Sequence, residues 1–192
     1  MIRIVRRADS SAFAKIHIAA LGGDFLPSLG FSFLKTFYNG VINTFGVYGF
    51  VYEEDGKVHG FVVGTRNSSK FFRRAIRANF IRFSFLLFVA LIKKPTIIKN
   101  IFETFLYPKK DVGAKAELVV IAVDNKYRGK GIGKRLVLAL EEEFKNRKIT
   151  SYKLTVHASK EAVGFYEHLG YSRISSFRLY DKMWYVYEKK IR

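Results

Sequence analysis

A glycine-rich turn between a buried strand and an amphipathic helix constrains this chain most strongly. The run from Glu117 to Val123 is apolar after its first residue and rich in β-branched side chains. This pattern predicts a central strand covered on both faces. The turn reads Arg-Gly-Lys-Gly-Ile-Gly at 128–133, and apolar residues then recur every four positions, at Ile132, Leu136, Leu140 and Phe144. That spacing predicts a helix packed on one side, so the chain is expected to be an α/β (α+β) protein.

The turn itself predicts an anion site. A glycine turn at a helix start gathers unpaired backbone N–H groups and the positive end of the helix dipole, and Arg128, Lys130 and Lys134 add positive charge. A P-loop is excluded because Lys134 is followed by Arg135 rather than Ser or Thr, and the glycines do not have the G-x-G-x-x-G spacing of dinucleotide folds. The remaining alternatives are a pyrophosphate site of another type and a glycine turn without a ligand.

The pattern Arg/Gln-x-x-Gly-x-Gly/Ala after a strand resembles the coenzyme A loop of the GNAT superfamily of N-acetyltransferases. A second segment supports this resemblance, because residues 159–171 read Ser-Lys-Glu-Ala-Val-Gly-Phe-Tyr-Glu-His-Leu-Gly-Tyr. They are similar to the family's Asn-x-x-Ala-x-x-Phe-Tyr-Glu-x-Leu-Gly-Phe, which forms the helix beside the coenzyme A thiol. Ser159 stands where the family usually has Asn, and a hydroxyl offers fewer donors and acceptors. The resemblance is strong over residues 114–190 and holds in outline over the first 66.

The resemblance implies an acetyl-CoA-dependent N-acetyltransferase that transfers the acetyl group directly to a primary amine. It assigns the thiolate-protonating acid to Tyr166 and the base that deprotonates the amine to Glu117. Their alternatives are a tyrosine packed by its ring and a strand-edge charge in solvent. The implied cofactor residues are Ile121, Ala122, Val123, Arg128, Gly129, Lys130, Gly131, Ile132, Gly133, Lys134 and Ser159. The acceptor stays open between an amino sugar or sugar nucleotide, a small amine and a protein amine.

The fold implied by the resemblance is a single domain, 1–192, with a mixed, mostly antiparallel sheet of about seven strands and flanking helices. The early sequence agrees with this expectation. A strand is predicted over 2–5, and a helix that Asp9 or Ser10 caps comes next. A second helix is predicted from Phe31 to Val41, and a hairpin with strands 47–53 and 57–65 turns at Asp55-Gly56.

Residues 66–110 form a basic window, with eleven Lys or Arg residues and Glu103 as the one acidic residue. This window holds over half of the net charge of +18. Apolar periodicity predicts one helix through Phe72 and Leu87 and a second one that opens at Pro95. We therefore expect a two-helix insertion, at about 67–110, between the third and fourth strands. It is either a substrate lid, a basic contact to an anionic membrane surface or to a phosphorylated acceptor, or a packing face toward the core or toward a second subunit in a homodimer.

Composition excludes several kinds of functional site. The chain has no cysteine, which excludes disulfides, thiolate metal sites and a cysteine nucleophile. The four histidines lack zinc spacing, so no metal is expected. The start of the chain lacks a signal-peptide pattern, which favours the cytoplasm or the inner face of the membrane. A basic protein that binds nucleic acid or a membrane surface on a GNAT-like scaffold is the competing function, although no helix-turn-helix, zinc-finger or RNP pattern supports nucleic acid.

Overall fold

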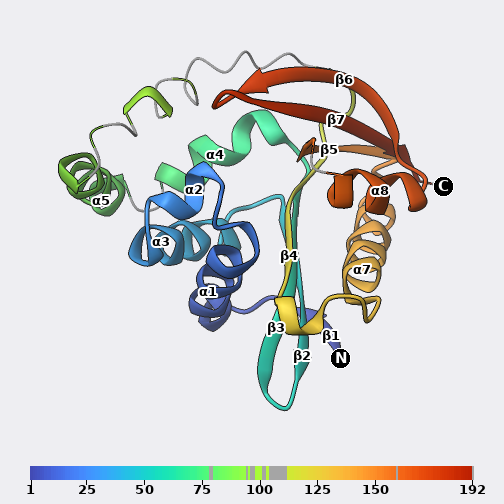
Figure 1. Ribbon diagram of the computed structural model, residues 1–192. Coiled ribbons are helices and arrows are strands. Elements are labelled where there is room, and N and C mark those ends of the chain that lie inside the picture. The colour runs from blue at the N-terminus through green and yellow to red at the C-terminus, as the bar shows by residue number, and fades with distance from the viewer. Residues whose placement is uncertain are drawn as a thin grey trace.

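The computed structural model describes residues 1–77, 80–93, 95, 98–100, 103, 112–158 and 160–191. Within these residues a seven-stranded sheet has the order β1-β2-β3-β4-β5-β7-β6 (Figure 1). All neighbouring strands are antiparallel except β4 and β5, which run parallel. The predicted mixed, mostly antiparallel sheet is thus confirmed. The strands are β1 (Ile2–Ile4), β2 (Val47–Glu54), β3 (Lys57–Thr65), β4 (Glu117–Val123), β5 (Ser151–His157), β6 (Ser172–Leu179) and β7 (Lys182–Lys190).

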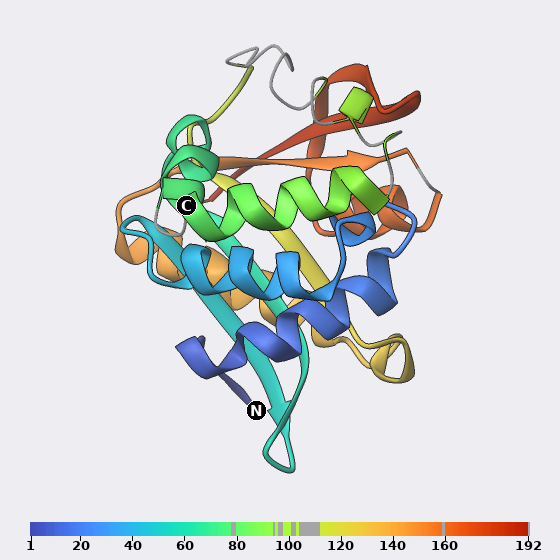
Figure 2. The ribbon, with the colours of Figure 1, turned by 90° about the vertical axis from the view of Figure 1, so that its left-hand side faces the viewer.

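Helices cover both faces of the sheet. Figure 1 shows α1 to α5 on one side and α7 and α8 on the other, and Figure 2 shows α5, α3 and α1 side by side on the first face. The helices are η1 (Arg7–Asp9), α1 (Ser10–Leu21), α2 (Phe25–Ser28), α3 (Phe31–Ile42), α4 (Ser68–Arg77), α5 (Phe80–Lys93), η2 (Asn125–Tyr127), α7 (Ile132–Asn146) and α8 (Lys160–His168).

Each face of the sheet has its own hydrophobic core. On the α7 side, the periodic residues Ile132, Leu136, Leu140 and Phe144 are all buried, as their spacing predicts. On the other side, aromatic rings dominate, and Phe13 of α1 stacks on Phe61 of β3 with 4.0 Å between the ring centroids. The other members of this second core come mainly from α3, namely Leu34, Phe37, Tyr38 and Val41. Two cores hold the central strands rigidly between two helical layers.

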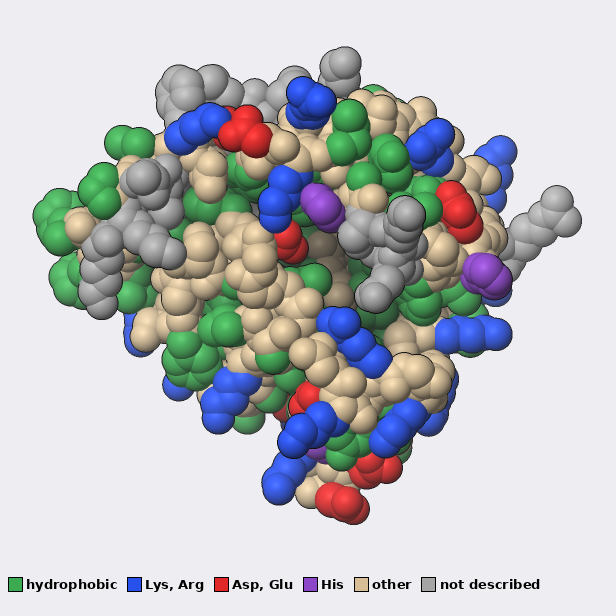
Figure 3. Space-filling model, in the orientation of Figure 1, with side chains coloured by type: hydrophobic (Ala, Val, Ile, Leu, Met, Phe, Trp, Pro, Cys, Tyr) green, Lys and Arg blue, Asp and Glu red, His purple; other side chains and the backbone are tan. Residues whose placement is uncertain are grey.

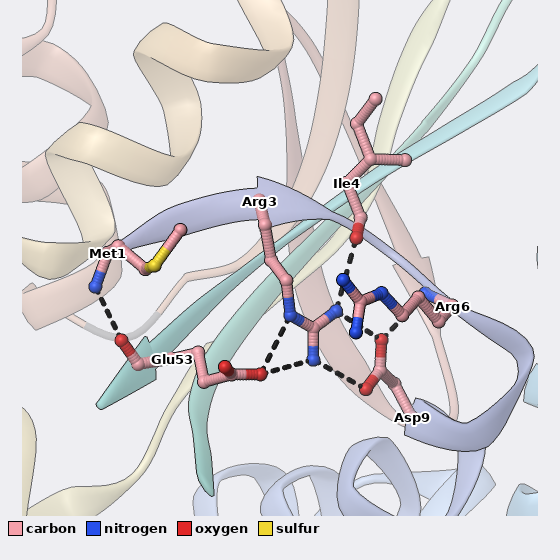
Figure 4. A network of polar contacts seen from close by, with 6 residues as sticks. All are labelled: Met1, Arg3, Ile4, Arg6, Asp9 and Glu53. Atoms are coloured by element: carbon pink, nitrogen blue, oxygen red, sulfur yellow. Dashed lines mark hydrogen bonds and ion pairs between the residues drawn. The ribbon is translucent and has the colours of Figure 1, made fainter. Parts of the chain in front are cut away.

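A polar network fixes the first strand to the sheet (Figure 4). Arg3 of β1 donates to Glu53 at 2.7 Å and forms two hydrogen bonds to Asp9, at 2.8 and 2.9 Å. The backbone N–H of Arg6 also donates to Asp9, at 2.7 Å. Burial alone would raise the pKa of Asp9, but the bonds from Arg3 and Arg6 lower it. Asp9 is the N-cap residue of α1, as predicted, but its side chain makes no capping hydrogen bond because Arg3 and Arg6 hold the carboxylate.

The basic window between β3 and β4 contains α4 and α5. The structure differs from the expected single helix over Phe72 to Leu87, since α4 ends at Arg77 and α5 begins at Phe80. Both helices contact α3, but α4 and α5 point in different directions (Figure 2), which one straight helix would not allow. The second helix predicted from Pro95 lies largely outside the described residues. The treatment of 67–110 as one insertion in a single domain stays a prediction.

Candidate functional site

The two parallel strands separate soon after they begin. β4 pairs with β5 only at its first two residues, Glu117 and Leu118, whereas it stays paired with β3 as far as Val123. Within the described residues, the side of 119–123 that faces β5 therefore has no strand partner. Backbone polar groups there are available to a bound ligand. This stretch contains the three predicted backbone donors Ile121, Ala122 and Val123.

The two predicted cofactor segments follow these strands directly. The glycine turn comes after β4, and α8 comes after β5. Ligands of open sheets bind at the carboxyl ends of parallel strands, where the connecting segments spread apart. Figure 3 shows a hollow near the middle of this side of the molecule, with Lys and Arg side chains below it. The fold thus brings two segments that are distant in sequence to one opening.

The glycine turn has the backbone that an anion site requires. Gly129 and Gly131 have φ angles of 76° and 72°, a conformation that side chains rarely adopt. A Cβ atom placed on either glycine would meet nothing within 4 Å, so the space above the turn is open. Gly131 is also the N-cap of α7 and gives it no side-chain cap. The first N–H groups of α7 therefore have no side-chain cap, an arrangement that favours anions at a helix N-terminus.

The other predicted residues of the turn have different surroundings. Arg128 donates to the carbonyl of Ala20 at the end of α1, at 3.3 Å, so it also ties the turn to the opposite layer. The ammonium of Lys130 lies 4.6 Å from the ring centroid of Tyr127. Lys134 is exposed on the first turn of α7. All three bring positive charge to the turn.

Two residues at the start of α7 face the protein rather than the opening. The side chain of Ile132 is buried in the core, so only its backbone N–H could contact a ligand. A Cβ atom on Gly133 would lie 3.3 Å from the ring of Phe165 in α8. The absence of a side chain at Gly133 therefore permits the close approach of α7 and α8. The sequence alone did not indicate this packing role.

Tyr166 lies on α8 at the edge of the α7-side core. Its side chain is buried, and its ring contacts the rings of Phe165 and Tyr171, with centroids 5.1 and 5.4 Å away. Burial raises the pKa of Tyr166 far above the usual range of a tyrosine. The phenol is consequently protonated at neutral pH, as a proton donor must be. Ser159, the other predicted residue of this segment, lies outside the described residues.

Glu117 lies where β4 and β5 are still paired, opposite Thr65 of β3 and Lys153 of β5. Burial raises the pKa of Glu117, while the charge of Lys153 and a hydrogen bond with the Ser68 side chain act in the lowering direction. Because Ser68 is the first residue of α4, this helix begins beside the carboxylate. Glu117 is thus a desolvated carboxyl group rather than a strand-edge charge in open solvent.

A pocket beside Asp24 was not predicted. It has a volume of about 190 Å³ and joins the α1–α2 connection to the β6–β7 turn. Burial raises the pKa of Asp24 in this pocket, against the lowering effects of Lys182, 3.9 Å away, and of His157. The only sequence signal was the chain break at Gly22-Gly23 and Pro27. The lining residues are Gly23, Asp24, Phe25, Ser28, Asn100, Tyr180, Lys182 and Trp184.

The four histidines have separate surroundings. His157, at the end of β5, contacts the ring of Trp184 beside the pocket, at 5.6 Å between centroids. His17 is buried against the hydroxyl of Tyr38, His59 stacks on Tyr127, and His168 bonds to a carbonyl within α8. Among the described residues no group of three or more metal-ligating side chains is present. No helix in the described part of the chain is long and apolar enough to cross a membrane.

Comparison with known proteins gives a family match for the second part of the chain. Residues 111–189 match the family model described as the acetyltransferase (GNAT) domain. This range includes β4, the glycine turn, α7 and α8, and thus both segments that carried the resemblance. This part of the chain is therefore similar to the GNAT acetyltransferase domain.

Individual proteins are similar to parts or to the whole of this chain. The uncharacterized protein YyaT of Bacillus subtilis (strain 168) is 48% identical over 65 residues, which are 34% of this chain and 42% of that protein. The match therefore spans less than half of the curated relative. Among solved structures, a ribosomal-protein-alanine N-acetyltransferase from Brucella melitensis has a TM-score of 0.66 at 17% identity, covering 100% of this chain and 99% of that one.

A second solved structure is similar over the whole chain. The PaiA N-acetyltransferase of Thermoplasma acidophilum, solved in complex with coenzyme A, has a TM-score of 0.58 at 14% identity, covering 100% of this chain and 98% of that one. At such identities the likeness shows the fold, and this fold is the one that the resemblance implied.

Proposed function

We propose that this protein is an acetyl-CoA-dependent N-acetyltransferase that acts on a primary amine. One observation carries the proposal: β4 and β5 separate after two paired residues, and an uncapped helix N-terminus lies at the carboxyl end of the separated strand. A long ligand with amides at one end and a pyrophosphate at the other matches this order of free strand groups followed by an anion site.

The proposed position of acetyl-CoA follows from this order of free strand groups and anion site. The pyrophosphate of acetyl-CoA would accept hydrogen bonds from the N–H groups at Gly131, Ile132 and Gly133. The cationic side chains of Arg128, Lys130 and Lys134 surround the same turn and favour a polyanion. The pantetheine amides would pair with backbone groups of 121–123, which places the thioester further along β4, toward Glu117 and α8.

The chemistry requires two proton transfers. The amine nitrogen attacks the thioester carbonyl carbon, the new C–N bond forms and the C–S bond breaks. The proton lost by the amine passes to the Glu117 carboxylate through water, and the departing sulfur receives the proton of Tyr166. Because burial disfavours the charged form of Tyr166, its phenol keeps this proton until the thiolate develops, and solvent then restores it.

The pocket beside Asp24 is the proposed acceptor site. Asp24 supplies a negative charge for an ammonium group, and the rings of Phe25, Tyr180 and Trp184 supply flat apolar walls. Lys182 and His157 lie close to the same carboxylate, so the site combines both charge signs. Such a mixture fits an acceptor with an amine and further polar groups, among amino sugars or sugar nucleotides, small amines and protein amines.

The direct test is an acceptor panel that measures coenzyme A release with a thiol-reactive dye. The chain contains no cysteine, so the protein gives no background signal. The panel contains sugar nucleotides, amino acids, polyamines and basic peptides. Thiol release that depends on one amine class supports the proposal. A protein that binds no acetyl-CoA but forms a salt-sensitive complex with nucleic acid would support the competing function instead.

A further inference from the structure

Helix α5 has two different faces. Phe83 is 5% exposed and contacts the rings of two phenylalanines of α3. On the opposite side lie Ile81, Phe85, Phe88 and Ile92, which are 86%, 64%, 61% and 66% exposed. At about 100° per residue these four positions form one row along the helix, roughly opposite Phe83. We call this row the α5 face. Within the described part of the chain, nothing covers it.

The α5 face is an outer surface of the molecule. Figure 2 shows α5 running beside α3, Figure 1 shows α5 at the outer edge of the helical layer, and Figure 3 shows hydrophobic side chains gathered at the edge where α5 lies. Four large apolar side chains in one exposed row exceed what scattered surface residues produce. The row therefore indicates a binding surface.

The surroundings of the α5 face are strongly basic. Between Asp55 and Glu103 the sequence contains no acidic residue. The adjacent helix α4 exposes Arg73, Arg74 and Arg77, and Arg82 is exposed on the flank of α5 itself. Arg74 also donates to the carbonyl of Phe45, a ring that is 86% exposed, at 3.3 Å. The α5 face and these arginines therefore lie on two neighbouring helices.

We propose that the α5 face docks on an anionic lipid bilayer. An apolar row flanked by arginines is the pattern of a helix that lies in the membrane interface, with its apolar side in the acyl boundary and its cations among anionic headgroups. With 14 residues, α5 would lie along the surface rather than span the bilayer. This inference is independent of the proposed catalysis, since α5 contributes no residue to the two proton transfers.

Two other occupants fit less well. A second copy of the chain would bring its own α4 arginines close to these arginines in a symmetric contact, and like charges oppose that approach. A nucleic acid would satisfy the arginines, but its phosphates offer nothing to a row of four exposed Ile and Phe side chains. The bilayer is the partner that uses both features.

The test is vesicle flotation of the full chain at low salt. Vesicles of phosphatidylcholine with phosphatidylglycerol are compared with vesicles of phosphatidylcholine alone. We expect binding to the anionic vesicles and little to the neutral ones. The double variant Phe85→Ser/Phe88→Ser should weaken binding at least about tenfold, because two rings leave the interface. Arg73→Gln/Arg77→Gln should weaken it about fivefold per arginine.

Matched controls separate docking from general effects. Leu138→Ser changes a side chain that is 48% exposed on α7, and Lys145→Gln/Lys190→Gln removes two exposed charges away from α4 and α5. Both controls should bind vesicles almost as the parent does. Thermal melting of every variant checks the fold. Since all the altered side chains are exposed, the melting temperature should hardly change.

Three outcomes would overturn the proposal. The first is a native protein that ignores anionic vesicles at low salt. The second is binding that falls with the arginine variant but not with Phe85→Ser/Phe88→Ser, which would be plain electrostatic adsorption. The third is a dimer in analytical ultracentrifugation that the same phenylalanine variant dissociates, which would make the α5 face a subunit interface. Acetyl-CoA affinity of the phenylalanine variant should equal that of the parent, whatever the vesicles show.

Discussion

The cofactor side and the acceptor side of the opening are built in different ways. The cofactor side comes from two continuous stretches, the turn after β4 and the α8 segment after β5. The pocket beside Asp24, the proposed acceptor site, joins residues from three separate parts of the chain, 23–28, 100 and 180–184. In the proposed function, acetyl-CoA would thus bind to local backbone geometry, whereas the acceptor would bind to side chains that only the tertiary fold brings together.

This comparison predicts separable effects. Variants of the cofactor side should change acetyl-CoA binding or the chemical step with every acceptor. Variants of the pocket should change the KM for the acceptor and leave acetyl-CoA binding alone.

The largest effect is expected from Tyr166→Phe. Loss of the phenolic proton should lower kcat by about 10²–10⁴ while acetyl-CoA still binds. Tyr171→Phe is the matched control, because it removes a neighbouring buried hydroxyl that bonds to Tyr152. That control should lower stability by about 1 kcal/mol with kcat nearly unchanged. Steady-state kinetics and thermal melts measure both. If Tyr166→Phe works at full rate with the best acceptor, Tyr166 is not the acid.

Glu117→Gln should lower the rate by about a hundredfold near neutral pH. Burial raises the pKa of Glu117, so the active carboxylate form is lost as pH falls through this raised value. The parent should therefore show an acidic limb above the ordinary glutamate range. The variant should lose that limb and recover part of its rate at high pH, where more acceptor amine is neutral.

The melting temperature of Glu117→Gln gives an independent test of the role of Glu117. A carboxyl group with a raised folded pKa contributes stability that is present at low pH and is lost as pH rises through that pKa. Glu117→Gln should therefore melt at or above the parent temperature at neutral pH. A rate defect that does not vary with pH, together with a lower melting temperature, would assign Glu117 a structural role.

Gly131→Val should weaken acetyl-CoA binding about tenfold to a hundredfold. Two effects account for this loss. The positive φ of 72° at Gly131 strains a β-branched residue, and the valine side chain would fill the open space of the proposed anion site. Gly56→Val is the matched control, since Gly56 has φ 71° and open space at the β2–β3 turn. Calorimetry on both folded variants measures their affinities for acetyl-CoA. Equal affinities would mean that the pyrophosphate lies elsewhere.

Asp24→Asn should have the smallest of these effects, an increase of about tenfold in acceptor KM. Acetyl-CoA affinity should stay the same. Asp181→Asn is the control, because Asp181 lies on the β6–β7 turn but is exposed and paired with Lys99 at 2.7 Å. Equal kinetics for the two variants would remove Asp24 from the acceptor site.

The same contrast explains what the sequence could predict. The strand at 117–123, the α7 periodicity and the Asp55-Gly56 hairpin are local patterns, and the structure contains all three elements. Contiguous motifs likewise indicated Gly131 and Tyr166, because backbone conformation and helix position depend on neighbouring residues. Their roles in catalysis and binding stay predictions.

Long-range contacts account for what sequence reasoning missed. Arg128 bonds to Ala20 across 108 positions, and Gly133 owes its packing role to Phe165 on another helix. The pocket beside Asp24 and the change of direction between α4 and α5 likewise depend on packing against distant segments. No local pattern reports which segments will meet in space.

Hydrogen–deuterium exchange with and without acetyl-CoA tests the central claim most directly, because it reports where the ligand binds on the unmodified protein. We expect acetyl-CoA to slow exchange in peptides covering 119–134 and the α8 segment, where the free groups of β4 and the first turn of α7 would gain partners. Peptides of the β2–β3 hairpin should exchange at the same rate in both samples. Unchanged exchange across 119–134 at saturating acetyl-CoA would contradict the account.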